Sequence, residues 1–459
     1  MNTLVPLKSP ISVNFETTQV CNLRCSFCFS TSATYIHKNP PLDHVKRIID
    51  ALAEAEVFEI RWFGGEFTAL KGWQDALLYA HSKGFFMGFV SNGTILTQED
   101  AKLMATLGIS GGAMSLHGLE DTHDSVVGVK GAFRKTIEGI KICKDAGIGI
   151  TALFTPTREN LKTLYPLATW LRGSDIPISE IDVGRLCPSG EAASGWDDRR
   201  LDLEDYRFLF KEMRRIQDDT GMHAYMGDAF PLCLLPYRDW DLVTGCWQGT
   251  GFGQISVSGD LKSCSILKVS YGNILETPLT EIWTEKLKTM RSLAHLPRQC
   301  RMCPHFCGGG CSASKVGATH FAPDEFIPSA EDESLLTMAR RIPGLLDFYV
   351  HRTLEQFKRK AVLPEVDLLI ESSSRPRIKG EYRMRQDSEC HIGFFKSRGI
   401  LTFDSLSASI MSLVDGVKSV EEITRMLDRG SVYDTKTCAA RVKSFISQMV
   451  NAGFMTLTT

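Results

Sequence analysis

The sequence predicts an α/β protein with a parallel sheet, followed by a small cysteine-rich region and then by a third domain that mixes strands and helices. Three observations support this prediction: six strand-then-helix units precede residue 190, cysteines concentrate between residues 233 and 311, and a new pattern begins near residue 376. A chain of 459 residues is also too long for one hydrophobic core, since single cores stop growing at roughly 250–300 residues. The expected divisions are residues 11–230, 231–330, 331–375 and 376–459, of which the third is a helix followed by a linker.

The first division alternates short apolar runs with amphipathic segments. Apolar residues recur at helical spacing of three and four within residues 42–52 and 133–140, and Thr97 with Asp100 predicts a helix cap. The expected strands are Ser12–Glu16, Glu59–Phe63, Phe86–Ser91, Gly112–Leu116, Gly149–Phe154 and Glu180–Leu186. Parallel strands need such helical crossovers, and ligands gather at their carboxyl ends. The pattern leaves open whether the sheet stays open or curls into a partial barrel.

Composition places the chain among ordinary globular proteins. Hydrophobic residues make up 43% and charged residues 23%, and the formal net charge is -2, without a basic block that would indicate a nucleic-acid footprint. No apolar run approaches the ~20 residues that cross a bilayer, and the N-terminus lacks the pattern of a signal peptide. We therefore expect no nucleic acid and no membrane, and a cytoplasmic location.

The spacing of the fourteen cysteines predicts metal ligation. Three fall between residues 21 and 28 and four between residues 300 and 311. Such tight spacing is unsuited to disulfides between distant elements and suited to thiolate ligands in a reducing compartment. Small cysteine-dense segments also need a metal to fold, because their apolar core is too small.

The first three of these cysteines form a ligand set that leaves one position open. Cys21, Cys25 and Cys28 follow the first strand, so their thiolates can point into one cavity built from loops. Three thiolates can hold a cubane cluster and leave one iron free for a small molecule. Structural zinc requires four ligands, and only the more distant His37 is a candidate for the fourth. The triplet favours an iron–sulfur cluster.

This C-x₃-C-x₂-C triplet after the first strand resembles the signature of the radical S-adenosylmethionine superfamily. The resemblance implies a partial (β/α)6 TIM-like barrel and a [4Fe–4S] cluster whose open iron is chelated by S-adenosylmethionine. It also implies a 5′-deoxyadenosyl radical that abstracts hydrogen, and an electron donor such as flavodoxin or ferredoxin. The cofactor does the chemistry, while the protein supplies orientation and a dry site. No catalytic base is assigned.

Further matches to this superfamily follow the next strands in order. Gly64-Gly65-Glu66 resembles the G-G-E-P motif that binds the methionine amino group, although Phe67 replaces the proline. The turns at residues 91–94 and 115–118 have ordinary turn sequences. Their order and spacing relative to the cysteines support the resemblance to the superfamily. The residues to which the resemblance gives cofactor-binding roles are Phe27, Gly64, Gly65, Glu66, Asn92 and Ser115.

The later cysteines resemble the SPASM extension of peptide-modifying members of the superfamily, which holds two auxiliary clusters. The resemblance assigns Cys246, Cys264 and Cys311 to the first auxiliary cluster. It assigns Cys300, Cys303 and Cys307 to the second. A zinc ribbon over residues 300–311 is the competing interpretation, since C-x₂-C is also a zinc pair.

Two features of this extension depart from the family pattern. The gap before the third cysteine of the run that starts at Cys300 is three residues, where five are usual, and the final cysteine is missing. The usual final cysteine is replaced by Ile327, so either Asp324 is a ligand or one iron is open. Cys233 is the candidate for the fourth ligand of the first auxiliary cluster. The isolated cysteines, which are expected to be core residues, are Cys143, Cys187, Cys390 and Cys438.

The last division predicts strands at Tyr382–Gln386, His391–Phe395 and Ile400–Phe403, followed by three helices. It resembles the winged-helix RiPP recognition element, similar to the peptide chaperone of pyrroloquinoline quinone biosynthesis. The resemblance implies that a leader peptide adds as a strand beside the third strand. A DNA-binding module would need a basic face, whereas residues 419–430 mix glutamates with arginines.

Together these resemblances imply a maturase of a ribosomally made precursor peptide. The last domain would bind the leader, and hydrogen abstraction from a core residue would give a crosslink, an epimer or a backbone excision. One alternative is a sulfatase-type maturase that forms formylglycine and needs no leader-binding domain. Another is a non-catalytic iron–sulfur sensor with a winged-helix output, which would not need the methionine-binding loops.

Overall fold

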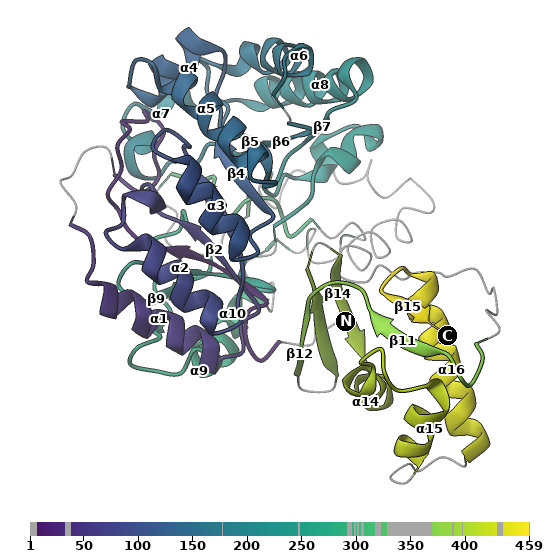
Figure 1. The fold of residues 1–459 in the computed structure, drawn as a ribbon. Coiled ribbons are helices and arrows are strands. Elements are labelled where there is room, and N and C mark those ends of the chain that lie inside the picture. Colours follow the sequence, from purple (N-terminus) through teal and green to yellow (C-terminus); the bar gives the residue numbers. More distant parts are fainter. Residues whose placement is uncertain are drawn as a thin grey trace. The chain divides into compact units, whose positions relative to one another are not determined.

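Two units make up the computed structural model, residues 1–342 and residues 343–459, and each is described by itself (Figure 1). The predicted subdivision of the first unit at residue 230 stays a prediction, and His37 lies outside the described residues. The structure describes residues 7–32, 38–176, 178–246, 248–291, 296–297, 300, 303, 307–316, 323–327, 370–387, 390–396, 398–428 and 435–458.

A ten-stranded sheet organises the first unit, in the order β10-β9-β8-β1-β2-β3-β4-β5-β6-β7. Its strands are β1 (Ser12–Glu16), β2 (Glu59–Phe63), β3 (Phe86–Ser91), β4 (Gly111–Ser115), β5 (Gly149–Phe154), β6 (Glu180–Val183), β7 (His223–Tyr225), β8 (Phe252–Ile255), β9 (Asp260–Lys262) and β10 (Gly272–Asn273). Neighbours from β8 to β7 run parallel, whereas β9 and β10 are antiparallel. The expected partial barrel is confirmed, and its parallel strands deliver their loops to one end.

Helices between the strands cover the outside of this sheet. They are α1 (Leu42–Glu54), α2 (Trp73–Ser82), α3 (Gln98–Thr106), α4 (Glu120–Val127), α5 (Ala132–Asp145), α6 (Leu164–Gly173), α7 (Trp196–Arg199), α8 (Leu203–Thr220), α9 (Leu279–Glu281) and α10 (Lys288–Arg291). The helices α1, α2, α3 and α5 lie one beside the next (Figure 1). The predicted cap of α3 is confirmed, since Thr97 and Asp100 form a reciprocal capping box.

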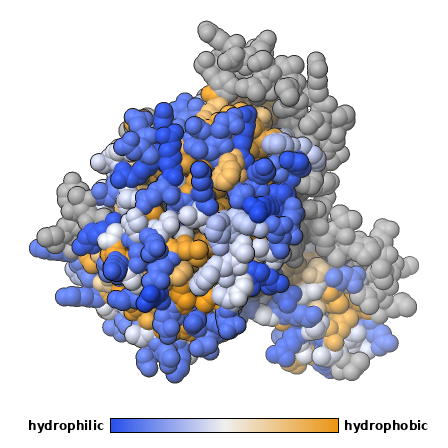
Figure 2. All heavy atoms as spheres, turned by 90° about the horizontal axis from the view of Figure 1, so that it is seen from above, coloured by the Kyte–Doolittle hydropathy of each residue, from blue (hydrophilic) through white to orange (hydrophobic). Residues whose placement is uncertain are grey.

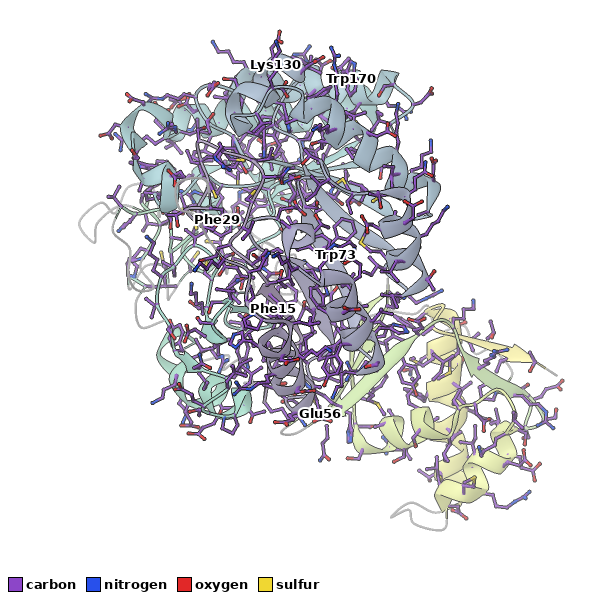
Figure 3. All side chains as sticks on the ribbon, turned by 60° about the vertical axis from the view of Figure 1, so that its left-hand side comes forward. Phe15, Phe29, Glu56, Trp73, Lys130 and Trp170 are labelled. Carbon is purple, nitrogen blue, oxygen red and sulfur yellow. The ribbon has the colours of Figure 1, made fainter. Side chains whose placement is uncertain are left out.

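Large aromatic side chains fill the layer between sheet and helices. Phe15 of β1 packs on Trp62 of β2 with ring centroids 6.0 Å apart, and Trp73 at the start of α2 meets Phe67 edge to face at 5.5 Å. Figure 3 labels Phe15 and Trp73 in this layer. Trp62 and Phe15 are fully buried, so the strands that carry the site's loops have a rigid base.

The strand predictions were accurate for long strands and incomplete for short ones. The sixth strand was expected to reach Leu186 but ends at Val183, because the Arg185 amide leaves the sheet and donates to Asp228 Oδ2 at 2.7 Å. The strands from β7 to β10 have four residues at most, which is too short for an alternating pattern to be recognised in the sequence.

The second unit combines two small antiparallel sheets with three helices. Its elements are β11 (Arg375–Ile378), β12 (Tyr382–Gln386), β13 (His391–Phe395), β14 (Gly399–Phe403), α14 (Ser405–Leu413), α15 (Val420–Asp428), α16 (Thr435–Asn451) and β15 (Met455–Thr458). The three predicted strands form one sheet in the order β12-β13-β14, and β11 pairs with β15, which the sequence did not predict. The helices cover a core that includes Phe395, Ile410 and Ile446.

No helix in the described part of the chain is both long and apolar enough to cross a membrane. The face of the protein seen in Figure 2 is mainly hydrophilic, with apolar patches between hydrophilic residues.

Candidate functional site

The loop after β1 carries Cys21, Cys25 and Cys28 and is fixed to the end of α4. Backbone bonds run from Arg24 N to Val127 O at 2.9 Å and from Ser26 N to Val126 O at 3.0 Å. Cys21 and Cys25 pack against Leu23, Val127 and Ala132 in one apolar cluster. The three predicted thiols are therefore brought together at the end of the first strand.

The electrostatics of these thiols fit a ligand set for iron. Burial raises the pKa of Cys21 to about 11, and the pKa of Cys25 is raised well above its usual value by burial and then by the Cys28 thiol. Unpaired thiolates would be unstable there, whereas coordination to a metal deprotonates a thiol outright. Among the described residues, no three His, Cys, Asp or Glu side chains converge as ligands of a single metal ion would. The observation that supports a cluster of several irons in this loop is the closeness of its three thiols.

Gly64 and Gly65 let the loop after β2 touch the loop after β1. A Cβ atom at Gly64 would lie 2.2 Å from Thr18 O, and one at Gly65 would lie 2.4 Å from Val20 O. Gly65 N donates to Thr18 O at 2.7 Å. The two glycines are required by this contact between loops, in addition to any approach of a cofactor.

Glu66 ties the same loop to the loop after β3. Its carboxylate is fully buried, and burial raises its pKa. Oε1 accepts from Thr68 Oγ1 at 2.8 Å and Ser91 Oγ at 2.9 Å, and Oε2 accepts from Asn92 N at 2.7 Å. Oε1 is thus saturated by the chain, while Oε2 keeps a lone pair for a ligand.

The loop after β3 is in turn bonded to the cysteine loop. Asn92 Nδ2 donates to Asn22 Oδ1 at 2.9 Å, and Asn22 Nδ2 donates to Thr94 Oγ1 at 2.7 Å. Asn22 directly follows Cys21 in the chain. The network Glu66–Asn92–Asn22 therefore sets the position of the first cysteine relative to the ends of two strands.

Phe27 and Ser115 complete the predicted set. The Phe27 ring meets His117 edge to face at 4.7 Å, and His117 Nδ1 accepts from Thr155 N at 3.1 Å. Ser115 ends β4 half-buried, and its hydroxyl has no hydrogen-bond partner among the described residues. Phe29, labelled in Figure 3, stacks on Phe63 at the end of β2 with centroids 6.4 Å apart. Aromatic rings thus shield the loop from water.

A pair of buried carboxylates lies at the end of β6. Burial and then the neighbouring Asp228 raise the pKa of Asp182 to about 7, although Gly227 N donates to its Oδ1 at 2.9 Å. Burial also raises the pKa of Asp228. Asp182 is thus able to gain or lose a proton near neutral pH.

The later cysteines fall into two groups, and Cys233 belongs to a different group from the one expected. Burial and then the thiols of Cys307, Cys303 and Cys300 raise the pKa of Cys233 to about 12. Cys233 lies in the 3₁₀ helix η4 (Leu232–Leu234). Its assignment to the first auxiliary cluster stays a prediction, which these neighbouring thiols do not favour.

The first auxiliary set contains the three predicted thiols. Burial and then Cys311 raise the pKa of Cys264 to about 12, and burial and then Cys264 raise the pKa of Cys246 beyond its usual range. Cys187, expected to be a core residue, also lies here, with its Sγ 3.9 Å from Cys311 Sγ. No local pattern indicated this contact, because Cys187 is isolated in the chain.

Asp324 is the counter-ion of a buried arginine. Both Arg185 and Asp324 side chains are fully buried, and Arg185 Nη2 donates to Asp324 Oδ1 at 2.9 Å while Nη1 binds Oδ2. Asp324 Oδ2 also accepts from Cys311 N at 2.8 Å. The alternative of Asp324 as an iron ligand is contradicted, since its oxygens are engaged by Arg185 and by the backbone.

Two family models match this chain. The Radical SAM superfamily matches residues 15–171, and SPASM, an iron–sulfur cluster-binding domain, matches residues 246–304.

Curated relatives share about a quarter of their residues with the chain. An AdoMet-dependent heme synthase of Nitratidesulfovibrio vulgaris is 28% identical over 66% of this chain and 87% of its own length. The mycofactocin maturase MftC of Mycolicibacterium smegmatis is 28% identical over 67% and 80%, respectively. The sporulation killing factor maturation protein SkfB of Bacillus subtilis is 26% identical over 60% and 64%.

Solved structures share the fold. SuiB of Streptococcus suis aligns with a TM-score of 0.55 at 18% identity, over 69% of this chain and 77% of SuiB. The protein anSMEcpe aligns with a TM-score of 0.55 at 14% identity, over 75% of this chain and 98% of its own. Both were crystallised with S-adenosylmethionine, and SuiB also with its precursor peptide SuiA.

Proposed function

The chain belongs to the radical SAM superfamily and carries a SPASM iron–sulfur region, and from this premise we propose that it is a maturase of a ribosomally made precursor peptide. It is an enzyme whose cofactors are S-adenosylmethionine and iron–sulfur clusters. The chemistry that these cofactors supply when bound is a 5′-deoxyadenosyl radical that takes a hydrogen atom from the substrate. The product is a crosslink, an epimer or a backbone excision, and a flavodoxin or ferredoxin in the cytoplasm is the proposed electron donor.

In this proposal, the loops at the strand ends hold the cluster, bind the cofactor and exclude water. Cys21, Cys25 and Cys28 hold the radical cluster, and Glu66 offers Oε2 to the methionine amino group while it fixes Asn92. The other residues that line the cofactor are Phe27, Gly64, Gly65, Asn92 and Ser115. Phe27 and Phe29 exclude water, and a dry site protects a reactive radical.

The second unit supplies the observation that carries the peptide assignment: among the described residues, β14 pairs on one side only, with β13. Lys396 N, just after β13, donates to Glu381 O, just before β12. The backbone N–H groups of an antiparallel strand point alternately toward one neighbouring strand and away from it, so this bond shows which amides of β13 face β12 and which face β14. By this alternation and the pairing of β13 with β14, the amides of Ile400 and Thr402 face away from β13. β14 is therefore ready to pair with an added strand, which is how an extended peptide binds a sheet edge.

Apolar side chains beside this edge suit a peptide leader. Phe403 is buried against Phe445 of α16 with centroids 5.9 Å apart, and Leu401 is half-buried on the same core. Among the relatives, MftC and SkfB are named as maturation proteins, and SuiB was crystallised with a precursor peptide. These names support a peptide substrate for this chain.

A tetrapyrrole substrate is the second candidate, since a heme synthase is also among the relatives. That alignment covers 66% of this chain and the MftC alignment covers 67%, so coverage does not separate the two candidates. An open strand edge has no evident use in binding a tetrapyrrole. Sulfatase-type maturation likewise needs no such edge, and the retained loops around Glu66 argue against a sensor.

The substitution Thr402→Pro tests the peptide assignment. Proline removes the outward amide of β14 without breaking its pairing with β13, so it should weaken leader binding at least ~5-fold, the equivalent of one hydrogen bond of about 1 kcal/mol. The probes are fluorescent synthetic peptides encoded by the short reading frames beside the gene, titrated into the full chain.

Gln386→Pro is the matched control, because Gln386 is an exposed residue whose amide faces outward on the opposite edge strand, β12. Wild type and this control should bind one of the peptides equally. Binding that survives Thr402→Pro unchanged would count against the β14 edge. A mass change in co-expressed peptide then identifies the substrate, and no change in any of the peptides would move the tetrapyrrole candidate ahead.

A further inference from the structure

The loop after β6 brings a fourth thiol to the first auxiliary site. Cys187 is buried and shares a small cluster with Leu267 and Ala313, against which Cys264 and Cys311 pack. Its Sγ lies 3.9 Å from Cys311 Sγ. The side chain of an ordinary core cysteine is surrounded by aliphatic groups, whereas the thiol of Cys187 lies beside that of Cys311, a proposed ligand.

The contact between Cys187 and Cys311 is not a disulfide. A disulfide joins its sulfurs at about 2.05 Å, and all the cysteines of this chain are free. A close contact between two free thiols instead suits two ligands of one cluster, since coordination to a metal deprotonates a thiol outright.

Hydrogen bonds on both sides of Cys187 hold it between two ligand segments. Arg185, two residues before it, binds Asp324, whose Oδ2 accepts from Cys311 N at 2.8 Å. Ser189, two residues after it, donates from Oγ to Ile266 O at 3.3 Å, and Ile266 N donates to Cys264 Sγ at 3.3 Å. The position of the thiol is therefore built into the fold by two independent links.

We propose that Cys187 is the fourth thiolate ligand of the first auxiliary cluster, so that no iron of that cluster is open to substrate. This inference rests on the proposed ligands Cys246, Cys264 and Cys311. With Cys233 beside Cys300, Cys303 and Cys307, the second auxiliary site also has four thiols. An iron with a full set of protein ligands can pass electrons but cannot bind a substrate group, which separates the two roles left open by the sequence.

The segment that carries Cys187 also reaches the radical site. Glu191 N donates to Cys28 O at 2.7 Å, and a Cβ atom at Gly190 would lie 2.3 Å from the same oxygen. Residues 187–191 and this hydrogen bond therefore form a short connection between the proposed first auxiliary site and the cysteine loop of the radical site. This geometry suits electron exchange between the two sites.

The test uses the full chain with Cys21, Cys25 and Cys28 replaced by alanine, so that only auxiliary clusters remain. Into this background we introduce Cys187→Ala, Cys187→Ser, Cys264→Ala and the control Cys143→Ala, which removes a buried thiol from α5. After anaerobic reconstitution, iron and sulfide per chain are measured, and paramagnetic resonance spectra of the dithionite-reduced protein are recorded with and without added 2-mercaptoethanol.

Cys187→Ala should lose roughly half of the auxiliary iron or acquire a spectrum that 2-mercaptoethanol changes, because one iron has lost its thiolate. Cys187→Ser should keep its iron and show shifted g-values, a signature that a packing role would not produce. Cys143→Ala should match the background.

The inference is overturned if Cys187→Ala matches Cys143→Ala in iron, sulfide and spectrum. A Cys187–Cys311 disulfide in the iron-loaded protein, detected by mass spectrometry without reduction, would also overturn it. Cys264→Ala separates this failure from that of its premise: iron loss in Cys264→Ala alone means that Cys187 is not a ligand, whereas no loss in either variant means that the proposed auxiliary ligands themselves are wrong.

Discussion

Replacing Arg185 with methionine should destabilise the first unit by about 3–5 kcal/mol, because the change leaves the Asp324 carboxylate buried without a partner. Both side chains are fully buried, and Asp324 also holds the Cys311 amide. Arg185 lies over the rings of Tyr206 and Phe230 at 5.3 Å and 5.1 Å, so packing is lost as well. The measurement is the urea midpoint of the iron-loaded chain, together with its iron content.

Arg207→Met is the matched control, since Arg207 pairs with Glu204 and both side chains are exposed. Exposed ion pairs contribute about 0–1 kcal/mol, so this variant should stay near the wild-type midpoint. The double variant Arg185→Met/Asp324→Leu should recover part of the loss, because it removes both charges. Equal midpoints for Arg185→Met and Arg207→Met would contradict the structural role given to the buried pair.

Glu66→Ala should weaken S-adenosylmethionine binding at least about tenfold, since it leaves Ser91 Oγ and Asn92 N without their buried acceptor. Each buried donor that has lost its acceptor costs ~1–3 kcal/mol. The loop after β3 can avoid this cost only by moving, and the movement takes it away from the cofactor. Glu66→Gln should be intermediate, because its amide keeps one acceptor but turns donors toward Asn92 N. Equilibrium dialysis with labelled S-adenosylmethionine measures the effect.

Glu138→Ala is the control for this experiment, because Glu138 is exposed on α5. Its affinity for S-adenosylmethionine should equal that of wild type. Wild-type affinity in Glu66→Ala, at unchanged iron content, would refute the idea that Glu66 fixes the loops around the cofactor.

Local patterns allowed the prediction of most elements and of the first cysteine triplet. The cap at Thr97 and Asp100 depends on residues three apart, and the helix stripe of α1 depends on spacing within a few turns. Cys21, Cys25 and Cys28 are neighbours in the chain, so any loop of that length brings their thiols together. In these cases the physical cause lies inside a short segment.

Contacts between distant segments could not be predicted from the sequence. Cys187 and Cys311 are 124 positions apart, and Arg185 and Asp324 are 139 positions apart. Which isolated thiol completes which site depends on how the loop after β6 and the helix η4 pack, and neither periodicity nor spacing encodes that packing. The same limit explains why the sequence indicated neither the contact of the buried Cys187 with Cys311 nor the place of Cys233 near Cys300, Cys303 and Cys307.

The most direct test of the central claim is cleavage of S-adenosylmethionine by the reconstituted full chain. Wild type, Cys25→Ala and Cys143→Ala are reconstituted with iron and sulfide without oxygen, reduced with dithionite, and analysed for 5′-deoxyadenosine by chromatography. Wild type and Cys143→Ala should form it, and Cys25→Ala should fall at least ~100-fold, since a direct ligand matters more than the surrounding residues that cost 10–100-fold. Absence of 5′-deoxyadenosine from fully loaded wild type, or equal amounts from Cys25→Ala, would contradict the assignment.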